Sequence, residues 1–127
     1  MEKEEVKKIN TREIGKEKES LAEKYLISEG YEILLKNFYT KIGEIDIIAY
    51  DKDRVLCFIE VKFRKTENFG LGLYAVDKNK QKRIYNSARI YMLMNNIKDN
   101  VPCRFDVVSI LNDKVTLVKN AFPLILY

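Results

Sequence analysis

Three ionisable residues stand out because each interrupts a run of apolar, β-prone residues. Asp46 lies within residues 43–50, and Glu60 and Lys62 lie within residues 54–63. Side chains alternate along a strand, so Glu60 and Lys62 share one face. A carboxylate flanked by Ile and Val is costly to bury unless it is neutralised or paired with a cation. The pattern therefore predicts either an internal ion pair or a site for a divalent metal ion.

The spacing of the two segments predicts how close these residues lie. A short polar turn centred on Lys52 indicates a hairpin, in which Asp46 lies opposite Phe58. Asp46 and Glu60 are then diagonal neighbours on one face, about 7–8 Å apart between backbones. Two carboxylates at this separation can bind one divalent cation, with Lys62 beside them. The alternative is a structural ion pair of Lys62 with one of the two acids.

The composition narrows the chemistry of any such site. The chain has 127 residues, which fits a single domain over residues 1–127, and it contains no histidine, which excludes His-based triads and imidazole general bases. The two cysteines are too few for a disulfide framework or a four-thiolate metal site. A bound metal is therefore expected to be a hard cation held by carboxylate and carbonyl oxygens. The net charge of +4 is only weak support for a nucleic-acid partner.

The sequence also bears on location. The first five residues carry charges where a signal peptide needs an apolar stretch, and no apolar run approaches the ~20 residues needed to cross a bilayer. We therefore expect a cytoplasmic protein with no membrane partner.

Hydrophobic spacing predicts the elements that position the acids. A first helix is expected from Thr11, its cap, to Gly30, and residues 1–10 are expected to fray. A second helix begins at Asp77. Strands are predicted at residues 31–35, 43–50, 54–63, 103–111 and 114–118. The order α-β-β-β-α-β-β predicts an α/β (α+β) fold in which a central mixed sheet is flanked by helices.

Two surfaces remain after this assignment. One is the apolar tail over residues 121–127, which is expected either to pack along the sheet or to form a dimer contact. The other is basic and can bind a phosphate backbone, or it is simply a solvated helix face. Its members lie on the second helix or close to the acids: Lys78, Lys80, Lys82, Arg83, Arg64 and Lys65.

The acids and lysine together resemble a known signature. Asp46, thirteen residues and then Glu60-x-Lys62 resemble the PD-(D/E)xK nuclease superfamily. The surrounding motifs resemble the YraN family, small bacterial proteins related to Holliday junction resolvases. These motifs are Gly43-Glu44-Ile45-Asp46, Glu60-Val61-Lys62-x-Arg64, Lys80-Gln81-x-Arg83 and Arg104-Phe105-Asp106, and the resemblance runs over about residues 15 to 122.

The resemblance implies a restriction-endonuclease-like fold and hydrolysis of DNA phosphodiester bonds with Mg²⁺ or Mn²⁺, with branched or junction DNA as the candidate substrate. It implies that Asp46 and Glu60 bind the metal, together with the carbonyl of Val61 and the carboxylate of Glu19. Lys62 would orient the attacking water or take up its proton.

The resemblance further implies that Gln81, on the second helix, reaches the active site. A homodimer is the implied assembly, since related resolvases act on two-fold symmetric junctions. The alternative function is a nuclease-fold module that binds nucleic acid with little or no cleavage.

Overall fold

The computed structural model describes the backbone of residues 2–64 and 76–123 and the side chains of residues 15–64 and 76–123. Its elements follow the predicted order: α1 (Glu2–Ser28), β1 (Glu32–Tyr39), β2 (Glu44–Tyr50), β3 (Leu56–Arg64), α2 (Lys78–Met94), β4 (Cys103–Leu111) and β5 (Lys114–Val118). The strands form one sheet in the order β1-β2-β3-β4-β5. Strands β3 and β4 are parallel and the other neighbours are antiparallel, which confirms a mixed sheet.

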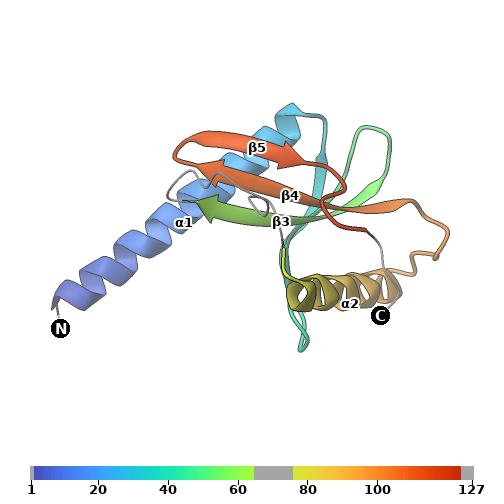
Figure 1. Cartoon of the computed structure of the whole chain (residues 1–127), viewed down its shortest axis with the longest axis horizontal. Coiled ribbons are helices and arrows are strands. Elements are labelled where there is room, and N and C mark those ends of the chain that lie inside the picture. The colour runs from blue at the N-terminus through green and yellow to red at the C-terminus, as the bar shows by residue number, and fades with distance from the viewer. Residues whose placement is uncertain (1, 65–75, 124–127) are drawn as a thin grey trace.

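The sheet lies between the two helices (Figure 1). Ala22 and Leu26 of α1 are buried in one apolar cluster, here called the α1 core, together with sheet residues such as Ile59. Ile84 and Tyr91 of α2 belong to a second cluster, the α2 core, on the other face. Two covered faces explain why β2 and β3 read as nearly continuous apolar runs. The prediction of a helix on each side is confirmed.

The first helix is longer than its apolar stripe suggested. It begins at Glu2 rather than at Thr11, so the predicted start of this helix is wrong. Residues 2–10 are mainly Glu and Lys, types with high helix propensity, and they extend the helix without an apolar stripe. The predicted end is confirmed: Gly30 has φ +92°. The Tyr31 N–H donates to the Leu26 carbonyl at 3.0 Å, which closes a Schellman motif.

The turn between β2 and β3 is longer than predicted, and this changes the register. Tyr50 pairs with Leu56, so the loop has five residues rather than three. Asp51 at the start of the loop accepts backbone N–H groups from within it, including that of Val55 at 2.9 Å. The ladder ends at Ile47 opposite Ile59, which places Asp46 beside Glu60. The predicted register, with Asp46 opposite Phe58, is therefore wrong by two residues.

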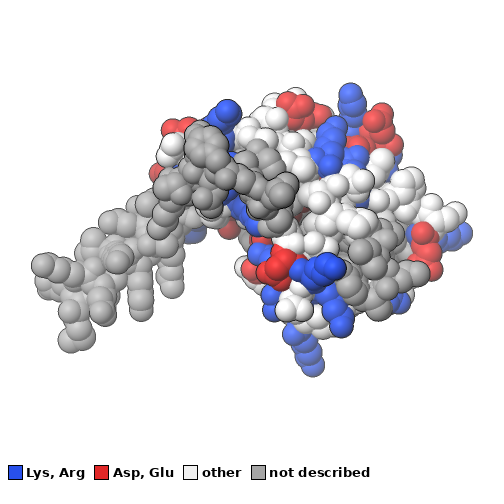
Figure 2. Space-filling view, in the orientation of Figure 1, with Lys and Arg blue, Asp and Glu red and all other residues white. Residues whose placement is uncertain are grey.

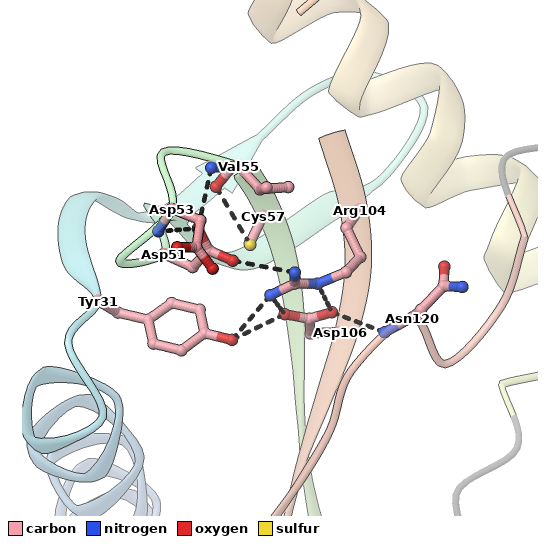
Figure 3. Close-up of polar contacts among 8 residues, drawn as sticks. All are labelled: Tyr31, Asp51, Asp53, Val55, Cys57, Arg104, Asp106 and Asn120. Atoms are coloured by element: carbon pink, nitrogen blue, oxygen red, sulfur yellow. Dashed lines mark hydrogen bonds and ion pairs between the residues drawn. The ribbon is translucent and has the colours of Figure 1, made fainter. Parts of the chain in front are cut away.

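A buried ion-pair network fastens this loop to the rest of the fold (Figure 3). The Arg104 guanidinium donates to both carboxylate oxygens of Asp106, at 2.8 and 3.0 Å, and to Asp51 at 3.0 Å. The hydroxyl of Tyr31 donates to Asp106 at 3.1 Å, and the backbone N–H of Asn120 donates to it at 2.9 Å. Asp106 is fully buried. The network joins β4 to the α1–β1 junction, the β2–β3 loop and the segment after β5.

Two further predictions concern the ends of the chain and the membrane. Phe122, at the start of the apolar tail, is buried and stacks on Phe105 with ring centroids 4.8 Å apart. Residues 124–127 lie outside the described residues. Within the described part of the chain, neither helix has the length and apolar character needed to cross a bilayer.

Candidate active site

Strand β2 is irregular at Asp46, the first of the three residues that the sequence singled out. Ile45 packs in the α2 core and Ile47 in the α1 core, although residues two apart on a regular strand share one face. Asn37, on the neighbouring strand β1, has φ +55° at the same level of the sheet. Ile45 and Ile47 therefore lie on opposite faces of the sheet, against the simple alternation of a regular strand. An irregularity of this kind re-aims a side chain, here that of Asp46.

Asp46 lies at the point where β2 and β3 stop pairing, here called the β2–β3 fork. Its carboxylate Oδ2 accepts the backbone N–H of Val61 at 2.8 Å, one residue beyond Glu60 on β3. Further along the ladder, a backbone carbonyl of β2 would accept such an N–H of β3. At this position the carboxylate of Asp46 accepts it instead. This contact holds the Asp46 side chain against Glu60.

The two acids perturb one another electrostatically. Burial is the largest cause that raises the pKa of Asp46, from 3.8 to about 7, and the negative charge of Glu60 is the next. The hydrogen bond from the Val61 N–H opposes this rise, while Glu44 adds to it. Two close carboxylates share a proton or bind a cation because both cannot be charged cheaply in a shielded position. A divalent cation can relieve this repulsion.

Glu60 already has one cationic partner, Lys80. The side chain of Glu60 is 6% exposed, and its Oε1 forms an ion pair with the ammonium of Lys80 from the first turn of α2. This partner was outside the alternatives that the strand pattern offered, which paired the acids with Lys62. The topology explains why Lys80 lies near Glu60. Helix α2 connects the parallel strands β3 and β4, so it starts beyond the carboxyl end of β3, close to this acid.

The tip of the β1–β2 connection brings α2 close to the acids. A Cβ at Gly43 would lie 3.0 Å from the Cβ of Arg83, so only glycine permits this approach without a shift of the helix. The hydroxyl of Thr40 lies 3.0 Å from that of Ser87 on the next turn of α2. These contacts fix the helix so that Lys80, one turn earlier than Arg83, faces Glu60.

The other predicted site residues differ in how close they lie to the two acids. Glu19 on α1 is exposed and lines a small pocket that also contains Asp46 and Val61. Lys62 is half-buried, on the face of β3 that carries Glu60. Gln81 donates its side-chain amide to the carbonyl of Val76 at 2.6 Å, at the start of α2, and it is its neighbour Lys80 that reaches Glu60. Lys65 lies outside the described residues.

The donor set fits a hard cation with few protein ligands. Among the described residues, no three His, Cys, Asp or Glu side chains are grouped as a metal cluster. Asp46 and Glu60 supply two adjacent carboxylates, and burial together with the charge of Glu60 raises the pKa of Asp46 to about 7. Mg²⁺ typically binds one or two carboxylates and keeps several waters. The pair is therefore sufficient for such an ion, with the Val61 carbonyl as a candidate third oxygen.

A basic surface lies beside the acids. Figure 2 shows Lys and Arg side chains next to acidic ones around the N-terminal end of α2. Lys78, Lys82 and Arg83 are exposed there. Arg64, at the end of β3, is half-buried and donates from Nε to the hydroxyl of Ser109 at 2.7 Å. An exposed cluster at a helix N-terminus favours anionic groups.

Comparison with known proteins agrees with the resemblance seen in the motifs. Residues 18–110 match the family described as uncharacterised protein family UPF0102. The chain is 46% identical over 116 residues to a UPF0102 protein of Caldanaerobacter subterraneus subsp. tengcongensis, covering 90% of this chain and 93% of that protein. It is 42% identical over 114 residues to a UPF0102 protein of Lachnoclostridium phytofermentans, covering 90% and 96%.

A third relative, a UPF0102 protein of Fusobacterium nucleatum, is 45% identical over 112 residues, covering 88% of this chain and 92% of that protein. These matches extend over nearly the whole length of the relatives and include both strands of the acidic site. The chain therefore belongs to the YraN family, the uncharacterised protein family UPF0102.

Proposed function

We propose that this protein is a metal-dependent endonuclease that hydrolyses DNA phosphodiester bonds. The observation that carries the proposal is the contact between Asp46 and Glu60 at the β2–β3 fork, beside a basic helix end. Two adjacent shielded carboxylates are an unfavourable arrangement for a structural role, because an apolar pair of similar size would avoid their repulsion. The arrangement is favourable once a divalent cation is bound.

Each residue of the site takes a role in hydrolysis that follows from its position. Asp46 and Glu60 hold the cation, and Val61 fixes the orientation of Asp46 through its N–H. When bound, Mg²⁺ lowers the pKa of a coordinated water and neutralises charge on the scissile phosphate. Lys62, on the same face as Glu60, orients the attacking water or takes up its proton.

The basic surface supports nucleic acid as the substrate. The exposed side chains of Lys78, Lys82 and Arg83 lie on the helix that contributes Lys80 to the acidic site. Each phosphate that they neutralise releases counterions from DNA. Branched or junction DNA is the substrate class to which the motif resemblance points.

A second candidate is a nucleic-acid-binding module with little or no cleavage. One observation favours it: the ammonium of Lys80 already neutralises Glu60. A site in which this ion pair persists would bind DNA through its basic surface without holding a metal ion.

The decisive experiment is a cleavage assay on plain duplex, single-stranded, flap and four-way junction DNA, with Mg²⁺ or Mn²⁺. We expect cleavage of at least one substrate, its loss in EDTA, and its loss in the Asp46→Asn and Glu60→Gln variants. Asp113→Asn is the matched control, since Asp113 has a 98% exposed side chain in the β4–β5 turn. It should cleave like the wild type.

If every substrate stays intact at stoichiometric protein with Mn²⁺, the nuclease proposal is wrong. Anisotropy with the same DNA then tests the binding module, which predicts salt-dependent binding that EDTA does not affect.

A further inference from the structure

Lys80 is anchored at one end and reaches a buried acid at the other. Its backbone N–H donates to the N-cap carboxylate of Asp77 at 2.9 Å, which fixes the residue in the first turn of α2. Its ammonium pairs with Oε1 of Glu60, while its side chain remains 40% exposed. The flexible side chain of Lys80 therefore extends from a fixed helix turn to the candidate metal site, and part of this side chain is exposed to solvent.

The position is unfavourable for a cation unless acids hold it there. The first turn of a helix is its positive end, where a positive charge is destabilising. Burial lowers the pKa of Lys80, but the hydrogen bond and charge of Glu60 outweigh burial and raise it, with smaller contributions from Asp46 and Glu44. The ammonium pairs with Oε1 of Glu60 and therefore sits where a cation held by the two acids would compete with it.

We propose that Lys80 is a displaceable counter-ion: it occupies Glu60 in the metal-free protein, a divalent cation displaces it, and the released ammonium then binds a DNA phosphate. The inference rests on the metal site of the proposed function and not on cleavage. In the metal-bound protein, the Lys80 side chain would take a second position, away from Glu60, which its partial exposure to solvent allows.

The second position lies within the basic surface. Arg83 is exposed three residues after Lys80, on the same side of α2, so an ammonium that leaves Glu60 lies near Arg83 and near the helix N-terminus, where anions bind favourably. Metal binding then adds one phosphate contact. By thermodynamic reciprocity, DNA must also raise the affinity of the protein for the metal.

The first test measures Mg²⁺ affinity from the melting temperature as a function of Mg²⁺ concentration. Lys80→Gln removes the competing charge, so it should bind Mg²⁺ on the order of tenfold more tightly than the wild type. Lys98→Gln is the matched control, because Lys98 is exposed in the loop after α2, and it should match the wild type. Equal or weaker Mg²⁺ binding by Lys80→Gln would overturn the proposal.

A measurement on the wild-type protein keeps the proposal testable if Lys80→Gln does not fold. In an NMR titration with Mg²⁺, the Cε–Hε signals of Lys80 should shift in parallel with metal saturation, and those of Lys98 should not. A Lys80 signal that does not respond while the protein is being saturated contradicts displacement.

The second test measures coupling with DNA. Fluorescence anisotropy of a short labelled duplex, with Ca²⁺ as a cation that supports binding, should show tighter binding with metal for the wild type. The gain should disappear in Lys80→Gln and persist in Lys98→Gln. A gain of the same size in Lys80→Gln would refute the transfer to phosphate.

The outcomes separate this inference from the nuclease proposal. A protein that binds metal and DNA in the expected pattern but cleaves nothing leaves the role of Lys80 standing and removes the nuclease. If neither the wild type nor Lys80→Gln responds to Mg²⁺ or Ca²⁺, both proposals are wrong.

Discussion

Replacing Asp46 by asparagine in the metal-free protein gives a sharp prediction about stability and pH. Burial and the charge of Glu60 raise the pKa of Asp46 to about 7 in the folded state, against 3.8 for the unperturbed group. Between these two values the folded protein binds a proton that the unfolded chain has released. The stabilisation from this proton is complete at low pH and is lost as the pH rises through about 7. The asparagine side chain is neutral at every pH, so the Asp46→Asn variant has no such loss.

The size of the effect follows from the width of this window. Within it, each pH unit changes the free energy of unfolding by at most about 1.4 kcal/mol. Between about pH 5 and pH 8, the stability of Asp46→Asn relative to the wild type should therefore increase on the order of 2 kcal/mol. Lys80 and Glu44, the other charged groups near this carboxyl, are present in both proteins and largely cancel in the difference.

Urea denaturation in EDTA at several pH values between about 5 and 8 measures this difference directly. Asp113→Asn, with its exposed side chain, should follow the wild type at each pH. Adding Mg²⁺ above about pH 7 should stabilise the wild type and leave Asp46→Asn unchanged. A pH-independent difference, or an Asp46→Asn protein that is destabilised at about pH 8, would refute the repulsion between the two acids.

Three further predictions address the scaffold and the basic surface. Arg104→Met should lower the free energy of unfolding by about 3–5 kcal/mol in urea, because it leaves two buried carboxylates without their cation; a loss under about 1 kcal/mol would contradict the network. Gly43→Ala should destabilise the fold by about 1–3 kcal/mol, since the new methyl group would lie 3.0 Å from the Cβ of Arg83; unchanged stability would show that α2 shifts freely. The double variant Lys82→Gln/Arg83→Gln should weaken DNA binding on all sequences and reduce the slope of log K against log salt by up to about 0.9 per lost phosphate contact, and an unchanged slope would assign this face to solvent.

The amino-acid sequence determined the elements and their layers. Alternating and continuous apolar runs predicted the strands because a sheet covered on both faces needs apolar residues at nearly every position. The bounds of β4 and β5 were predicted to the residue, and Gly30 ended α1 because its φ of +92° suits glycine. The start of α1 was missed, since a charged helix without an apolar stripe gives no periodic signal.

The sequence also determined which strand residues were candidates for chemistry. Asp46 and Glu60 are acids within apolar strands, which is visible without any structure. Their mutual placement was not visible, because it depends on a five-residue loop and on an irregularity in β2. A register error of two residues keeps the same faces but changes diagonal neighbours into opposite ones.

Only the tertiary structure decided that Lys80 belongs to the acidic site. In the sequence it is one of several lysines on a basic helix, separated from Glu60 by nineteen residues, and only its place four residues before Ile84, on the apolar face of the helix, sets it apart from Lys78 and Lys82. The parallel pairing of β3 with β4 places the start of α2 near these acids, and Gly43 lets the helix approach closely enough for the ion pair. Long-range electrostatic contacts of this kind depend on how helices and strands pack, and that packing has no signature in the order of residues along one element.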